Sequence, residues 1–342
     1  MSETALRLPG DRVPDAPDLA SHLRAWAGDI AERQALSGVM QTIAQAAIPL
    51  ADRLALARLP GDPSKLVGTN DNGDLQKALD VGAHHHLLKA LAGASVRHVL
   101  SEEEEAIQTL STDGLFDVVM DPIDGSDSIG IGASLGLLFA VFPTGEGFRH
   151  SGREIIAAGY IHFGHCIEMG FSVGSSHAGG NGLCMAAYDR PSDLFRVTRT
   201  DIQLAAEANC IAFNASNVRR WPRGLQRYIA AILKGKEGPR GQDFNMRWLA
   251  AAVGELHRIV ERGGVFMYPA DPRPGYQQGR LRLLYEAFPI AWLIEQAGGS
   301  ASDGKGPILD RIPTSLHENT PLFFGARDEM ATLLRSLQGR QH

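Results

Sequence analysis

The chain has 342 residues, 44% of them hydrophobic and 21% charged, and its formal net charge is −6. These values exclude a disordered chain and are typical of a folded protein with two lobes. A mildly acidic surface disfavours nucleic acid, so we expect no nucleic-acid partner; a phosphorylated substrate would need metal cations to offset the field of the protein.

The N-terminal residues are polar, contain proline and lack the apolar core of a signal peptide. We expect residues 1–17 to form a flexible segment, and we expect a cytoplasmic protein without membrane contact. Cys166, Cys184 and Cys210 are widely spaced and form no CxxC pair, which indicates thiols in a reducing compartment.

Apolar periodicity predicts two helices and then a sheet in the N-terminal half. The helices are expected over 35–59, where Pro60 and Gly61 follow, and over 74–91, with a polar loop over 65–73 between them. Short apolar runs then predict a mostly meandering sheet, with strands at 95–100, 116–120, 134–142, 155–163 and 166–174. The polar segment 190–200 interrupts this pattern, so we expect an N-terminal lobe over 18–195 and a C-terminal lobe over 196–342.

The C-terminal half combines both periodicities. Helices are expected over 223–234 and 243–262, the second ended by Gly263 and Gly264. Strands are expected at 265–269 and 280–286, followed by a helix over 287–297. The whole pattern favours an α/β fold of stacked helix and sheet layers, with a site where the two lobes meet.

The most informative stretch is DPIDGSDSIG, residues 121–130, which follows the apolar run FDVVM. Asp121 is expected at the end of a strand and Asp124 on the tight turn after it, with both carboxylates aimed into one pocket. Such oxygen ligands suit Mg²⁺ or Mn²⁺, and the N–H groups of Gly125 and Ser126 can hold a phosphate. Taken alone, the motif is equally consistent with an ordinary Asx-type turn.

Other acidic residues favour the metal interpretation. Glu102 begins the acidic run 102–105 directly after a predicted strand, and Glu286 ends another apolar run. Active sites of open sheets gather at strand ends, so we expect Glu102, Asp121 and Glu286 to converge. Alone, the acidic run would be a solvated helix start, and Asp74 and Asp80 would be a cap and a surface acid.

DPIDGS resembles the metal-binding signature of the Mg²⁺-dependent, lithium-sensitive sugar and inositol phosphatase superfamily. Four further stretches resemble class I fructose-1,6-bisphosphatase: NGDLQKALD (72–80), VLSEEEEAI (99–107), RWLAAAVGELHR (247–258) and the long block 263–317 from GGVFMYP to PTSLH. The likeness runs from about residue 36 to 330. It implies the sugar-phosphatase fold and hydrolysis of the 1-phosphate of fructose 1,6-bisphosphate, in gluconeogenesis or the Calvin cycle. It also implies two or more Mg²⁺ ions per subunit, with Mn²⁺ as a substitute, and a homotetramer.

The resemblance also implies roles for individual residues. The metal ligands would be Glu102, Asp121, the carbonyl of Ile123, Asp124 and Glu286. Asp80 and Glu103 would help to deprotonate the attacking water. Asp74 and Asp80 would lie on a mobile loop that closes over the metals, with Asp74 paired to Arg282. The cleaved phosphate would lie against Asp124, Gly125 and Ser126. The other phosphate would be held by Asn214, Tyr268, Arg280 and, from a neighbouring subunit, Arg247.

Several positions depart from the family pattern and leave the substrate open. They are Asp127 after the serine of the turn, Trp248, Ala252, and Val218 or Asn217 where a tyrosine is expected. Fewer hydroxyl donors and more room suggest that sedoheptulose 1,7-bisphosphate is a second substrate. Inositol or nucleotide monophosphates, or a catalytically silent sugar-phosphate sensor, are further alternatives. The AMP-inhibition site of the family also lacks counterparts around 36–38, at Leu115-Phe116 and at Pro143.

Overall fold

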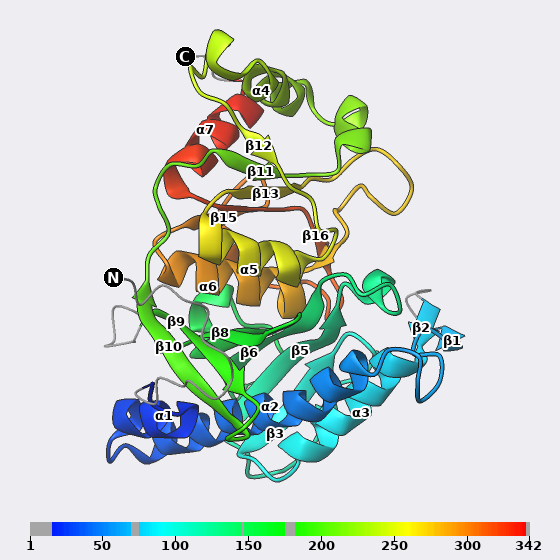
Figure 1. Ribbon diagram of the computed structural model, residues 1–342, viewed down its shortest axis with the longest axis vertical. Coiled ribbons are helices and arrows are strands. Elements are labelled where there is room, and N and C mark those ends of the chain that lie inside the picture. The colour runs from blue at the N-terminus through cyan, green and yellow to red at the C-terminus, as the bar shows by residue number, and fades with distance from the viewer. Residues whose placement is uncertain (1–15, 70–74, 146, 175–181, 340–342) are drawn as a thin grey trace, which may run out of the picture.

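The computed structural model describes residues 16–69, 75–145, 147–174 and 182–339. Within these residues, helix layers alternate with two sheets, and the expected layered α/β architecture is confirmed (Figure 1). The lowest layer of the view contains α1 (Leu19–Ala27), α2 (Ala31–Ala55) and α3 (Ala78–Leu91). The central layer contains α5 (Ala252–Arg262) and α6 (Phe288–Gln296), and the upper layer contains α4 (Arg223–Leu233) and α7 (Arg327–Leu337).

The larger sheet has the order β10-β9-β8-β7-β6-β5-β3-β4. Its strands are β3 (Val96–Ser101), β4 (Gln108–Thr109), β5 (Phe116–Asp124), β6 (Leu135–Pro143), β7 (Ala157–Phe163), β8 (Ile167–Val173), β9 (Leu183–Asp189) and β10 (Leu194–Ile202). From β5 to β10 each strand pairs antiparallel with the next, and β3 runs parallel to β5. The predicted meander is therefore confirmed over most of the sheet.

The smaller sheet has the order β12-β11-β13-β17-β15. Its strands are β11 (Cys210–Ala212), β12 (Asn245–Met246), β13 (Val265–Tyr268), β15 (Ser300–Ser302) and β17 (Leu322–Gly325). Two short pairs stand apart: β1 (Leu66–Thr69) with β2 (Leu75–Lys77), and β14 (Leu281–Arg282) with β16 (Asn319–Thr320).

Burial on both faces explains why β5 appears in the sequence as a continuous apolar run. Val118 and Met120 face the core against the lowest helix layer, and Val119 faces the core against α5 and α6. Side chains alternate along a strand, so a strand between two helix layers needs apolar residues at every position. This burial carries the acidic end of β5 into the centre of the molecule.

Several predicted boundaries were wrong. The first helix, α2, ends at Ala55 rather than 59; α3 begins at Ala78 because β2 precedes it; and α5 begins at Ala252 rather than 243. The apolar run 280–286 is a strand only at Leu281–Arg282 and then forms a π-helical turn, Leu283–Ala287. Tertiary packing overrides local propensity at these short segments.

The segment 190–200 does not interrupt the sheet as expected. Residues 194–200 belong to β10, which pairs with β9 at the edge of the sheet, so its polar residues lie on an edge strand. The predicted division at 195/196 falls inside this strand, and we propose the lobe boundary after Ile202 instead. The predicted flexible segment lies almost wholly outside the described residues. No helix in the described part of the chain is both long and apolar enough to cross a membrane.

Candidate metal centre and active site

The two aspartates of the DPIDG motif both lie in β5, so Asp124 is not on the turn as expected. Residues three apart on a regular strand point to opposite faces of the sheet. The pairing of β5 with β6 shifts between Asp121 and Asp124, and such an irregularity re-aims side chains. The Asp121 carboxylate also accepts a hydrogen bond from the N–H of Ile123 at 3.0 Å, which fixes its rotamer. Both carboxylates therefore occupy the same side of the strand.

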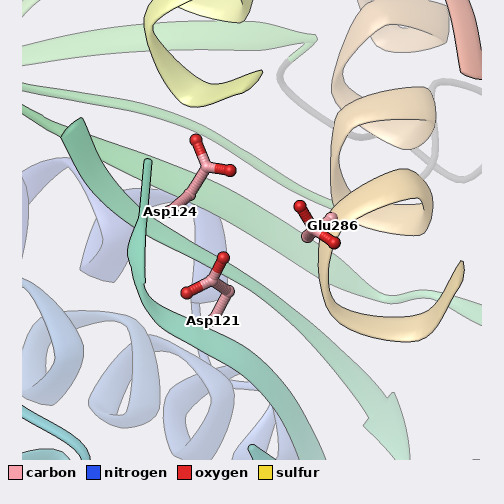
Figure 2. Close-up of side chains that lie close together, drawn as sticks. All are labelled: Asp121, Asp124 and Glu286. Atoms are coloured by element: carbon pink, nitrogen blue, oxygen red, sulfur yellow. The ribbon is translucent and has the colours of Figure 1, made fainter. Parts of the chain in front are cut away.

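Glu286 reaches these aspartates from the opposite layer. It lies in the π-helical turn that leads into α6, not at a strand end, and its side chain points toward β5 (Figure 2). One carboxylate oxygen from each of Asp121, Asp124 and Glu286 lies within 4.8 Å of the others. The N–H of Arg282 donates to the Glu286 carboxylate and holds it in place.

Glu102 completes this acidic group. It follows β3, and its N–H donates to the carbonyl of Met120 at 3.2 Å, beside Asp121. Its side chain is hydrogen-bonded to the Asp121 carboxyl, and its charge raises the pKa of both Asp121 and Glu286. The structure thus brings together the four carboxylates that the resemblance implies as metal ligands. The fifth, the carbonyl of Ile123, lies between Asp121 and Asp124 and stays a prediction.

Burial makes this cluster unfavourable without a cation. Desolvation raises the pKa of Asp121 and Glu286 well above the usual values, and neighbouring carboxylates raise them further. Burial also raises the pKa of Asp124 to about 6, although the N–H groups of Val253 and Ala252 at the start of α5 oppose the shift. An all-oxygen donor set of buried acids is the environment that hard divalent cations such as Mg²⁺ prefer. The residues present therefore fit divalent cations.

We expect the metal-free protein to lose stability as the pH rises from about 4 to about 7. The folded pKa of Asp124 is about 6, and the ordinary value is 3.8, so the folded state binds more protons in this window. Excess protons in the folded state make the free energy of unfolding fall with pH, on the order of 3 kcal/mol for a two-unit shift. Urea unfolding in a chelator at several pH values measures the slope. It should flatten in Asp124→Asn and when Mg²⁺ is added; an unchanged slope would contradict the assignment.

Asp80 lies at the edge of the same site, in the first turn of α3. It is buried, and its Oδ1 has no hydrogen-bond partner among the residues that the structure describes. Burial, with the charge of Glu103, raises its pKa to about 7, and Lys77 opposes the shift. A carboxylate poised near neutral pH is suited to accept a proton from water. Asp80 and Glu103 are therefore close enough to interact, whereas Asp74 and its predicted pairing with Arg282 lie outside the described residues.

Gly125 and Ser126 form the turn that follows β5. Gly125 has φ +81°, and an added Cβ would lie 2.6 Å from the Cβ of Ala251, so glycine is required both for the backbone and for the packing. The Ser126 carbonyl accepts a hydrogen bond from Lys77 Nζ at 2.7 Å. Lys77 also lies 3.2 Å from the exposed Asp127 carboxylate, which offsets the charge that Asp127 adds.

The residues expected at the second phosphate gather in part. Tyr268, at the end of β13, is close enough to Arg280 and Glu286 for both charges to affect its pKa, which burial raises. The Arg280 guanidinium lies over the Tyr276 ring at 5.1 Å. Trp248 stacks on Tyr268 with centroids 6.1 Å apart and nearly parallel planes. This stacking holds the Tyr268 ring in one orientation.

Asn214 and Arg247 lie in different settings. The amide oxygen of Asn214 caps the short helix Ala215–Arg220 by accepting hydrogen bonds from the N–H and hydroxyl of Ser216. Arg247 follows β12, is exposed, and donates to the carbonyl of Met246 at 2.9 Å. Arg282, expected as a supporting residue, donates to the carbonyl of His317 at 3.0 Å.

Sequence reasoning missed two contributors. Lys77 anchors the Ser126 carbonyl, and the N–H of Val253 donates to Asp124 at 2.6 Å. A backbone donor has no sequence signature, and Lys77 carried no signal beyond its place in the NGDLQKALD stretch.

A layered α/β fold with buried oxygen ligands beside a glycine–serine turn defines a metal-dependent phosphatase of the sugar-phosphatase type. Family models for the fructose-1-6-bisphosphatase N-terminal and C-terminal domains match residues 28–189 and 204–338. The chain is 45% identical over 325 residues to the class 1 fructose-1,6-bisphosphatases of Brucella anthropi and Brucella suis biovar 1, covering 94% of each chain. The chain therefore belongs to the class 1 fructose-1,6-bisphosphatase family.

A solved structure supports the same assignment. The crystal structure of Leishmania major fructose-1,6-bisphosphatase in holo form superimposes with a TM-score of 0.85 at 26% identity, covering 96% of this chain and all of that one. The predicted sugar-phosphatase fold is confirmed.

Proposed function

We propose that the chain hydrolyses the 1-phosphate of fructose 1,6-bisphosphate, giving fructose 6-phosphate and phosphate. The observation that carries this proposal is the oxygen cluster of Asp121, Asp124 and Glu286 within 4.8 Å, in a chain 45% identical to class 1 fructose-1,6-bisphosphatases. The product and substrate place the enzyme in carbohydrate metabolism. The same cluster and identity support dependence on divalent metal.

We further propose Mg²⁺ as the physiological ion, with Mn²⁺ as a substitute and two or more ions per subunit. Glu102, Asp121, Asp124 and Glu286 would hold the ions with the Ile123 carbonyl. Bound divalent cations lower the pKa of a coordinated water and stabilise charge on the phosphoryl oxygens. Backbone N–H groups hold the carboxylates of Asp121, Asp124 and Glu286 in place, so these side chains would bind the ions without first reorganising.

Protein groups then direct the hydrolysis. Asp80, with Glu103 beside it, accepts the proton from the attacking water. Gly125 and Ser126 present N–H and hydroxyl donors to the oxygens of the cleaved phosphate, and Lys77 fixes that turn through the Ser126 carbonyl. A positioned base and preorganised donors both act more strongly on the transition state than on bound substrate.

A panel of phosphate esters tests the proposal directly. Phosphate release from fructose 1,6-bisphosphate, sedoheptulose 1,7-bisphosphate, fructose 6-phosphate and inositol monophosphate should be measured with and without Mg²⁺. We expect Mg²⁺-dependent release with the fructose bisphosphate preferred. No release from any ester, despite measurable ligand binding, would support the sugar-phosphate sensor instead. Turnover of the seven-carbon sugar would add a second substrate.

Arg280→Ala should weaken recognition of the second phosphate. A guanidinium grips a phosphate through two donors, and loss of such a contact costs about 2 kcal/mol or more, roughly a 30-fold fall in kcat/KM. Fructose 1-phosphate lacks the group that Arg280 would bind, so its kcat/KM should change little. The exposed Arg335→Ala, at the end of α7, is a matched control. An equal fall in kcat/KM for both substrates would show that Arg280 does not bind the second phosphate.

We also propose a homotetramer in which Arg247 reaches the active site of a neighbouring subunit. The exposure of Arg247 supports this role, and light scattering measures the mass of the assembly.

We also propose a cytoplasmic location, which the free thiols of Cys166 and Cys210 support.

AMP should inhibit this enzyme weakly or not at all. The resemblance matches the AMP-phosphate site to Leu115, Phe116 and Pro143, none of which carries a donor for phosphate. Phe116 is fully buried and Leu115 is half-exposed, and both side chains are apolar. These two positions therefore offer no positive charge to a phosphate group. Initial rates over a range of AMP concentrations measure the effect. Tight, cooperative inhibition would require a different nucleotide site.

A further inference from the structure

A buried carboxylate that the proposed hydrolysis does not use lies in the first turn of α5. Glu255 is fully buried, and each of its two oxygens has its own donor. The N–H of Leu249 donates to Oε1 at 2.6 Å, and Arg258 Nε donates to Oε2 at 2.9 Å. A buried charge is costly unless it is paired and hydrogen-bonded, so both donors stabilise this carboxylate.

Arg258 fixes the carboxylate within the central layer. It follows Glu255 by about one turn of the same helix, and its Nη1 lies 3.2 Å from Cys210 Sγ in β11. The same nitrogen donates to the carbonyl of Gly263, where α5 ends. One side of the Glu255 carboxylate is therefore tied to the smaller sheet and to the far end of the helix. The other oxygen holds the chain that precedes α5.

The hydrogen bond from Leu249 holds a strained piece of backbone. α5 begins at Ala252, so Glu255 reaches back past the helix start to the segment 249–251. Within this segment Ala250 has φ +62°, in the left-handed region that a residue with a Cβ rarely adopts. Strained backbone persists only where the surrounding structure imposes it, and the anchored Leu249 N–H is directly next to Ala250.

This segment meets the proposed active site through Ala251 and the start of α5. The Ala251 Cβ would lie 2.6 Å from a Cβ added at Gly125, so the two residues are closely packed. As alanine, Ala251 carries no side-chain acceptor to cap the helix. The first N–H groups of α5, from Ala252 and Val253, are directed instead at Asp124. Such N–H groups form the positive end of a helix, so they favour a charged carboxylate.

We propose that Glu255 is a positioning residue for the candidate metal centre. By holding the Leu249 N–H, it keeps the segment 249–251 in place and so aims the first N–H groups of α5 at Asp124. Hydrogen bonds to a ligating carboxylate orient it, and their loss typically weakens metal affinity about 10- to 100-fold. The inference deepens the proposed function, because it rests on Asp124 being a metal ligand.

Magnesium binding to the purified full-length protein tests this role without requiring turnover. Glu255→Met keeps the length of the side chain but offers no oxygen acceptor to the Leu249 N–H. Isothermal titration should show that Mg²⁺ binds about tenfold more weakly than to the parent. The Mg²⁺ concentration that gives half the maximal rate of phosphate release from fructose 1,6-bisphosphate should rise by a similar factor.

Two further variants separate positioning from stability. Glu255→Met leaves Arg258 unpaired and should lower the Tm, whereas Glu255→Met/Arg258→Met removes both partners and should recover most of that Tm. The double variant should nevertheless keep the weak Mg²⁺ binding, and it carries the test if the single variant does not fold. Glu329→Met is the matched control, because Glu329 is also buried and bound to an arginine, Arg240, but lies in α7. It should lower the Tm and leave the Mg²⁺ affinity unchanged.

Distinct outcomes identify which proposal is wrong. Parental Mg²⁺ affinity in Glu255→Met or in the double variant would overturn the positioning role and leave the proposed function intact. An equal loss of affinity in Glu329→Met would do the same, because general destabilisation would then explain the effect. A parent that binds no Mg²⁺ would overturn the metal centre and the proposed function together with the positioning role.

Discussion

Asp121→Asn is expected to lower kcat for fructose 1,6-bisphosphate by about a thousandfold or more. The Asp121 carboxylate lies at the centre of the acidic group, hydrogen-bonded to the side chain of Glu102 and within 4.8 Å of Asp124 and Glu286. A neutral amide weakens the hold on a divalent cation, and several kcal/mol of charge stabilisation depend on that cation. Mg²⁺-dependent phosphate release measures the loss, and isothermal titration should show weaker Mg²⁺ binding.

The control for this variant lies in the turn that follows β5. Asp127→Asn removes an equal charge, but the Asp127 side chain is fully exposed, so its kcat should change no more than about threefold. The metal-free Asp121→Asn protein should unfold at the same temperature as the parent or higher, because the substitution removes like-charge repulsion among buried acids. A lower Tm would attribute the lost activity to misfolding, and full activity would exclude Asp121 as a ligand.

Asp80→Asn is expected to lower kcat by about 10²- to 10⁴-fold, the range for loss of a general base. In the metal-free protein, burial and Glu103 raise the pKa of Asp80 to about 7, and bound cations would lower it. Only the deprotonated carboxylate accepts a proton, so the parent should lose activity as the pH falls below that pKa. A pH profile of kcat in saturating Mg²⁺ should show this acidic limb in the parent and a much flatter one in Asp80→Asn.

Glu104→Gln is the control for Asp80→Asn, because it removes a carboxylate from the same acidic surroundings. Glu104 follows Glu103 in the same run but is not among the residues proposed to act, so its variant should keep both kcat and the acidic limb. KM for fructose 1,6-bisphosphate should change little in Asp80→Asn, since Asp80 is assigned to the water rather than to the sugar. A large rise in KM with an unchanged kcat would instead make Asp80 a binding residue.

The convergence of the acidic residues was predictable in part. Strand-end reasoning placed Glu102 and Asp121 together, and they lie on the parallel pair β3 and β5: Glu102 directly follows β3, and Asp121 lies within β5. The same reasoning put Glu286 at the end of a strand, although it lies in a π-helical turn. Its apolar neighbours are buried whether the backbone is extended or helical, so the apolar run 280–286 alone does not distinguish the two. Glu286 therefore meets the two aspartates as expected, but from a helical turn and not from a strand.

Edge strands and short insertions were the least predictable parts of the fold. β10 is polar because one of its faces meets solvent at the sheet edge, and its bulged register removes the simple alternation. β1 and β2 were expected as a loop and a helix start, since pairing between two very short strands leaves no periodic pattern. Both errors concern segments whose structure is fixed by a neighbouring strand.

The sequence by itself determined the layered α/β class, the central buried strands and the acidic turn, because these follow from hydrophobic periodicity and from carboxylates placed beside glycine. Only the tertiary structure decided how the carboxylates meet: an irregularity in β5 turns Asp121 and Asp124 to one side, and a π-helical turn delivers Glu286 from another layer. It also decided the contact between His257 of α5 and Glu168 of β8, because contacts between elements far apart in the chain leave no local pattern in the sequence.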